Sequence, residues 1–121
     1  MILLDTHALI WLDRNHPRAR PLLERPSTLR ISPATVLEWQ FLIEAGRLRL
    51  RAPREAILAD DRWQLDDPPA LAWFDRAAEE SWTREPFDRL IVAHARLRGW
   101  RLATADAAIL ERLRPSERFE L

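Results

Sequence analysis

Short apolar runs alternate with segments of helical periodicity along the whole chain. The runs are three or four residues long and do not alternate with polar residues, which is typical of strands buried on both faces of a parallel sheet. Helix boundary signals separate them: Ser32 and Pro33 form a strong helix start, and Gly46 is a stop signal. The pattern therefore predicts an α/β protein, with a parallel sheet covered on both faces by helices.

This pattern places each expected element along the chain. The predicted strands are residues 1–4, 28–31, 101–103 and 118–121, with a short extended piece at 63–65. The predicted helices are residues 6–13, 17–24, 33–45, 53–61, 67–80, 86–99 and 106–113, with a loop at 81–85. Pro21 weakens the second helix, since proline disrupts a helix interior. Repeats and internal linkers are absent, so we expect one domain over residues 1–121.

Composition narrows the class of protein. The chain has 121 residues, 47% of them apolar, which is enough for one domain with a real core. No apolar run approaches the ~20 residues that span a bilayer, and Asp5 breaks the N-terminal run too early for a signal peptide, so we expect no membrane partner. The lack of cysteine excludes disulfides, thiolate zinc sites and thiol nucleophiles, and fits a cytoplasmic location.

The charged residues balance, with 19 basic against 19 acidic side chains, so the chain is not a generic electrostatic binder of nucleic acid. Every basic side chain except histidine is an arginine, and lysine is absent. This gap removes reactions that need a lysine.

Four acidic residues stand at positions that would normally be apolar or uncharged: Asp5, Glu38, Asp88 and Asp106. Asp5 and Asp106 follow predicted strands, and ligand sites of open parallel sheets lie beyond such strand ends. A carboxylate in such a place is costly unless it is paired or bound to a metal. Four of them suggest a hard divalent cation and metal-assisted hydrolysis.

Each acid also has a simpler explanation. Asp5 and Asp106 suit the N-cap of the following helix, and Asp88 suits the positive end of a helix dipole. Glu38 lies within an apolar stripe of its helix, formed by Ala34, Leu37, Phe41 and Ala45. The opposite side carries Val36, Trp39 and Ile43, so we expect both sides to be covered and Glu38 to be held away from water.

Four segments together resemble the PIN domains of the VapC toxin type. They are residues 3–11 (LLDTHALIW), 32–38 (SPATVLE) continued by 46–48 (GRL), 85–91 (EPFDRLI) with 93–95 (AHA), and 102–106 (LATAD). Each motif is weak alone, but their order and spacing extend over nearly the whole chain.

The resemblance implies a PIN fold, a three-layer α/β/α sandwich with a parallel sheet of four to five strands. It implies an endoribonuclease that depends on Mg²⁺ or Mn²⁺ and acts as the toxin of a type II toxin–antitoxin pair, with RNA as substrate and a cognate antitoxin as partner. Asp5, Glu38, Asp88 and Asp106 would be the catalytic and metal-site acids. Thr6 and Thr104 would support them by hydroxyl hydrogen bonds.

The loop before Asp88 departs from the family pattern. This subgroup usually reads HRDPFD, whereas residues 83–88 read TREPFD, with Thr83 in place of histidine and Glu85 in place of aspartate. The departure bears on how substrate is positioned. The four core acids are present, so the resemblance still implies an active enzyme.

Substrate and partner contacts have weaker signals. Arg84 and Arg89 flank the third acid and are candidate RNA contacts, and a basic rim is expected from Arg47, Arg49, Arg51 and Arg54. The family often forms homodimers. The candidate partner surface is Trp11, Val36, Trp39 and Ile43, because aromatic residues are enriched at interface cores; plain core packing explains them as well.

Other classes fit less well. A receiver domain needs a lysine, and a haloacid-dehalogenase phosphatase needs an aspartate two residues after the first, where His7 stands. A non-catalytic PIN-like module that binds RNA or protein remains open, as does a nuclease directed at DNA. The residues leave a one-metal or two-metal mechanism undecided.

Overall fold

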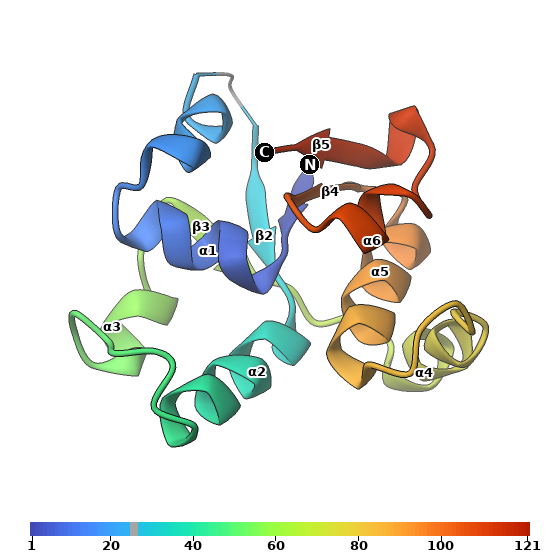
Figure 1. Cartoon of the computed structure of the whole chain (residues 1–121), viewed down its shortest axis with the longest axis horizontal. Helices are drawn as coiled ribbons and strands as arrows, with labels where there is room; N and C mark the ends of the chain where they lie inside the picture. Colours follow the sequence, from blue (N-terminus) through green and yellow to red (C-terminus); the bar gives the residue numbers. More distant parts are fainter. Residues whose placement is uncertain (25–26) are drawn as a thin grey trace.

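The computed structural model describes residues 1–24 and 27–121, which form a parallel sheet with helices on both faces (Figure 1). The strands are β1 (Ile2–Leu4), β2 (Leu29–Ile31), β3 (Trp63–Leu65), β4 (Arg101–Thr104) and β5 (Arg118–Glu120). The helices are α1 (Thr6–Asp13), α2 (Pro33–Glu44), α3 (Arg54–Leu58), α4 (Ala70–Ala78), α5 (Pro86–Arg98) and α6 (Ala107–Leu110), with 3₁₀ helices η1 (Pro17–Leu22) and η2 (Pro115–Glu117).

The strand order is β3-β2-β1-β4-β5, and every neighbouring pair is parallel. The first strand therefore lies in the middle, with Leu3 opposite Arg30 on one side and Leu102 on the other. The chain winds outward from β1 through β2 to β3, then returns to the other side of β1 for β4 and β5. The order reverses between β1 and β4, and ligands of open α/β sheets bind at such a reversal.

Each face of the sheet has its own apolar cluster, because successive side chains of a strand point to opposite faces. On one face Ile2 and Leu4 pack with residues of α1, η1, α3 and β5, together with Trp39 of α2. On the other face Leu3 and Leu102 pack against α4, α5 and α6. The predicted α/β sandwich with a parallel sheet is thus confirmed, with five strands.

Prolines explain most differences from the predicted boundaries. The helix expected from residue 67 begins at Ala70, because residues before a proline avoid helical backbone and Pro68 and Pro69 follow Asp67. The predicted 17–24 helix is the 3₁₀ helix η1, with Pro21 inside it. The predicted 53–61 and 106–113 helices shorten to α3 and α6, and the extended piece at 63–65 is a full member of the sheet.

The prediction that α2 is covered on both sides was wrong. Leu37 is 51% exposed and Phe41 53% exposed, whereas Trp39 is 1% exposed and belongs to the core. One helix packs on a sheet through one side only, and the side of Trp39 is the one that faces the sheet. Trp39 is therefore unsuited to the partner surface proposed for it, while Trp11, Val36 and Ile43 are half-buried.

Within the described residues, no helix has the length and apolar character needed to cross a membrane.

Candidate functional site

Two of the four acids follow adjacent strands at the point where the strand order reverses. Asp5 comes directly after β1 and is the N-cap of α1, where its Oδ1 accepts a hydrogen bond from the Ala8 amide at 2.7 Å. Asp106 comes two residues after β4 and is the N-cap of α6, with Oδ1 2.9 Å from the Ala108 amide nitrogen. Parallel pairing of β1 with β4 brings the two residues to the same edge of the sheet.

The other two acids come from helices that begin near this edge. Glu38 lies in the middle of α2 and accepts a hydrogen bond from the Thr6 hydroxyl. Asp88 lies in the first turn of α5, whose N-cap is Glu85. The Glu85 carboxylate accepts a hydrogen bond from the Asp88 amide at 2.6 Å, which fixes the start of this helix.

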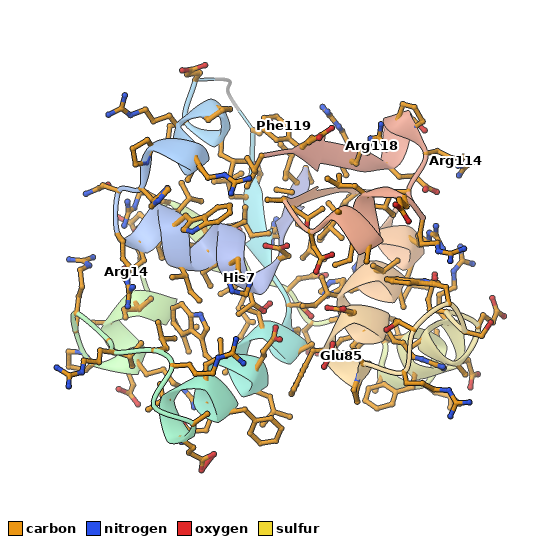
Figure 2. The ribbon with its side chains drawn as sticks, in the orientation of Figure 1. His7, Arg14, Glu85, Arg114, Arg118 and Phe119 are labelled. Atoms are coloured by element: carbon orange, nitrogen blue, oxygen red, sulfur yellow. The ribbon has the colours of Figure 1, made fainter. Side chains whose placement is uncertain are left out.

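A cleft of about 480 Å³ brings all four acids together with Glu85. Its other lining residues are Thr6, His7, Trp11, Arg18, Arg47, Ile91, Ala105 and Ile109. Figure 2 labels His7 at the start of α1 and Glu85 before α5, and both lie toward the middle of the view, between α1, α2 and α5. The fold thus brings together acids that lie far apart in the sequence.

Burial and neighbouring charges raise the pKa values of three cleft acids, Asp5, Glu38 and Asp88. Burial raises the pKa of Asp5, although hydrogen bonds from the Thr104 hydroxyl and the Ala8 amide oppose it. Burial also raises the pKa of Glu38, opposed by the Thr6 hydroxyl and assisted by the negative charge of Glu85. Each acid therefore holds its proton more tightly than a free carboxylic acid does.

Asp88 is also perturbed in the cleft. Burial and repulsion from Glu85 and Asp106 raise its pKa to about 7. Near neutral pH this carboxyl is thus only partly ionised in the protein alone. A cation in the cleft would reverse the balance, since a nearby positive charge favours the ionised form.

The threonines connect the acids with one another. Thr6 donates to Glu38, and Thr104 hydrogen-bonds Asp5 while its Oγ1 accepts from the Asp106 amide at 3.1 Å. Both threonine side chains are buried. They hold the carboxylates of Glu38 and Asp5 and the backbone of Asp106 in a fixed relation, as hydroxyls next to metal-site acids commonly do.

The donor set fits a hard divalent cation, since it consists of carboxylate oxygens with no thiolate. The carboxylates are nevertheless not gathered around one point: among the residues described, no three acidic or histidine side chains are close enough to hold a metal. Asp5, Glu85 and Asp106 are turned toward helix N-termini. Hydrogen bonds from the helix amides fix these side chains, and a bound cation would have to draw them together.

Of the basic residues expected at the cleft from the sequence, only Arg47 lines it. Arg84 and Arg89 flank Asp88 along the chain but do not line the cleft, and the Nε of Arg89 donates to the Thr83 carbonyl at 2.7 Å. Of the expected basic rim, Arg47 reaches the cleft, while Arg51 pairs with Asp13 at 2.9 Å.

Three cleft residues were missed by the sequence reasoning. Glu85 had a local signal, as an acid directly before a helix-starting proline. Arg18 and His7 had none, because their position depends on how η1 and α1 pack beside α2.

A five-stranded parallel sheet with an acidic cleft at its strand-order reversal defines an open α/β fold with a candidate ligand site, and comparison with known proteins identifies the family. The PIN domain family matches residues 2–114. The chain belongs to this family, as its four motifs indicated.

Known relatives point to the VapC type within the family. The chain is 29% identical to ribonuclease VapC22 of Mycobacterium tuberculosis, over 94% of this chain and 93% of that protein. Its fold resembles a toxin–antitoxin complex chain from Klebsiella pneumoniae, with a TM-score of 0.72 and 20% identity over all of both chains. It also resembles the sarcin–ricin loop-cleaving toxin VapC20 of M. tuberculosis, with a TM-score of 0.67 and 20% identity over 95% and 100% of the two chains.

Proposed function

We propose that residues 1–121 form one PIN domain that acts as an endoribonuclease, dependent on Mg²⁺ or Mn²⁺, and as the toxin of a toxin–antitoxin pair. The observation that carries the proposal is the cleft itself, where Asp5, Glu38, Asp88 and Asp106 line one hollow at the strand-order reversal. The likeness to a ribonuclease over nearly the full length of both chains supports the choice of RNA.

Asp5, Asp88 and Asp106 would hold the cation, with Glu38 completing the site. The cation supplies Lewis-acid chemistry, because it acidifies water and offsets the charge of a phosphodiester. The protein supplies orientation. Glu38 or Asp106 would accept a hydrogen bond from the attacking water and direct it in line at phosphorus, which leaves a 5′-phosphate and a 3′-hydroxyl.

The threonines would set the geometry of this reaction. Thr6 fixes the carboxylate of Glu38, and Thr104 ties Asp5 to the start of α6. Each restricts an acid to few rotamers, so that less ordering is needed when substrate binds. The raised pKa of Asp88 adds a proton that must leave before this carboxyl can serve a cation.

The proposed partners are a cognate antitoxin and a second copy of the chain, which would make a homodimer. Similar proteins have been crystallised in toxin–antitoxin complexes. Leu37 and Phe41 of α2 are exposed, and Phe41 meets Phe87 edge to face at 5.4 Å. These side chains, with half-buried Trp11, replace the core residue Trp39 in the proposed partner surface.

Cleavage of total RNA by antitoxin-free protein tests the function. We expect cutting in Mg²⁺ or Mn²⁺, none in EDTA, and none by Asp5→Asn. Asp61→Asn is the matched control, because Asp61 is an exposed acid outside the cleft. Cutting by Asp5→Asn at the wild-type rate would reject the proposed site.

A non-catalytic PIN-like binding module is the second candidate. The observation in its favour is that the cleft acids cap helices instead of converging. Well-folded, metal-loaded protein that binds RNA but cuts neither RNA nor DNA would establish this alternative. Cutting of DNA in preference to RNA would instead change the assigned substrate.

A further inference from the structure

Two arginines line the cleft, one from each of two segments. Arg18 belongs to η1, and Arg47 follows the end of α2. Both side chains are exposed, and neither takes part in an ion pair within the described part of the chain. They are cations in an otherwise acidic hollow, with their charge available to a ligand.

Neighbouring residues hold the side chain of Arg18 in place. Its guanidinium carbon lies 4.6 Å from the ring centroid of Trp11, and its Nη2 donates to the Leu121 carbonyl at 3.1 Å. Its backbone amide donates to Nδ1 of His16 at 3.1 Å, and the His16 ring stacks on Trp11 with centroids 5.4 Å apart. A guanidinium held in this way loses little side-chain freedom on binding a ligand.

Three apolar residues also line the cleft: Ile91 of α5, Ala105 before α6 and Ile109 of α6. A polyanion that enters the cleft therefore meets repulsion from the acids, apolar contacts and two guanidinium groups. Guanidinium groups bind phosphate with paired, charge-assisted hydrogen bonds.

We propose that Arg18 and Arg47 each bind a backbone phosphate of the RNA strand near the bond that is cut, and so fix the strand across the acids. The proposal rests on the ribonuclease function proposed above and names two of its substrate-binding residues. Net neutrality of the chain is then compatible with RNA binding, because the needed positive charge is local.

The chain offers matched controls two residues away from each arginine. Arg20 is exposed in the same 3₁₀ helix as Arg18 but lines a different hollow, with Leu12, Asn15 and Leu23. Arg49 is exposed like Arg47 and does not line the cleft. Arginine-to-glutamine substitutions at these four positions change net charge equally and differ in where that charge lies.

Binding of a fluorescein-labelled single-stranded RNA, followed by anisotropy in Mg²⁺ buffer, measures the contacts directly. An Asp5→Asn background prevents cutting and keeps the N-cap, since asparagine caps helices as well as aspartate. We expect the slope of log K against log salt to weaken by about 0.7 in Arg18→Gln and in Arg47→Gln, and by about 1.4 in the double variant. Arg20→Gln and Arg49→Gln should keep the parent slope, as should the charge-preserving Arg18→Lys.

Kinetics with Asp5 restored provide the second measurement. Arg18→Gln and Arg47→Gln should raise KM about tenfold with little change in kcat. Unchanged slopes and KM in these variants, beside metal-dependent cutting by the parent, would overturn this proposal alone. Equal losses in Arg20→Gln and Arg49→Gln would overturn it as well, since the effect would be general charge. A parent that neither binds nor cuts RNA would overturn both proposals.

Discussion

Replacing Asp88 by asparagine should stabilise the metal-free protein above neutral pH. In the folded chain, burial and the charges of Glu85 and Asp106 raise the pKa of Asp88 from 3.8 to about 7. The unfolded chain releases this proton at lower pH than the folded chain does. The wild-type free energy of unfolding therefore carries a penalty that begins near pH 3.8, grows as the pH rises and is complete above about 7. Asparagine cannot ionise and avoids the penalty.

The size of the penalty follows from the shift. At 1.36 kcal/mol for each pKa unit, the shift corresponds to a ceiling of roughly 4 kcal/mol. Asp88 is only half-buried, so water screens much of the repulsion, and the stabilisation expected at pH 8 is roughly 1–2 kcal/mol. Below pH 4 the two proteins should be equally stable.

Urea unfolding at several pH values, followed by the fluorescence of the six tryptophans in EDTA, measures this difference. Asp75→Asn on the exposed side of α4 is the control and should show no comparable gain. An Asp88→Asn protein that is no more stable than wild type at pH 8 would refute the view that the acids repel one another in the cleft. Added Mg²⁺ should raise the stability of wild type more than that of Asp88→Asn, because the cation relieves the repulsion.

Three further predictions concern the frame around the site. Trp39→Ala should lower the free energy of unfolding by about 3–5 kcal/mol and Phe41→Ala by much less, because the Trp39 side chain is in the core and the Phe41 side chain is exposed. Equal urea midpoints for the two variants would contradict the conclusion that the Trp39 side of α2 faces the sheet. Gly99→Ala should lower the free energy of unfolding by about 1 kcal/mol, because Gly99 ends α5 with φ 69°, a backbone conformation that strains any side chain even where the space around it is open. Thermal unfolding measures this loss. Burial lowers the pKa of His94, although its bond to Asp66 at 2.7 Å opposes the shift, so the folded protein favours the neutral ring. The stability advantage of wild type over His94→Gln should thus be full above about pH 6.5 and shrink as the pH falls below it, and an advantage that grows in acid would show that His94 is charged in the fold.

Much of the sheet was predictable because short buried strands appear in the sequence as short runs of apolar residues. The run at Ile2–Leu4 and the run at Arg101–Thr104 read as strands from their apolar residues alone. Parallel strands end at one edge of a sheet, so acids that follow two such runs, Asp5 and Asp106, were expected to meet. Their roles as metal ligands stay a prediction.

The exposed side of α2 and the positions of the cleft arginines could not be predicted from hydrophobic periodicity. The helix α2 has apolar residues on two sides, and only the packing of the whole domain decides that Trp39 faces the sheet and Phe41 faces water. The packing of the whole domain also decides which arginines line the cleft. Arg18 and Arg47 are 29 residues apart in the chain. Arg18 has no local motif that distinguishes it from Arg20, and Arg47 was expected only as one of four arginines of a basic rim. Long-range packing sets the positions of both arginines, and these contacts cannot be read directly from a single sequence.

The position of β1 in the middle of the sheet has a consequence for synthesis of the protein. Its partner β4 lies about a hundred residues later, and Asp106 comes later still. Chains emerge from the ribosome N-terminus first, so β1 stays unpaired on one side until β4 has been made. The acidic cleft is therefore completed only after β4 and Asp106 have been made. A nascent chain that stops before β4 holds Asp5, Glu38 and Asp88 at most, without the strand that sets Asp5 beside Asp106. The order of the strands thus delays completion of the proposed ribonuclease site until β4 has been made, so a partly synthesised chain without β4 should lack the activity.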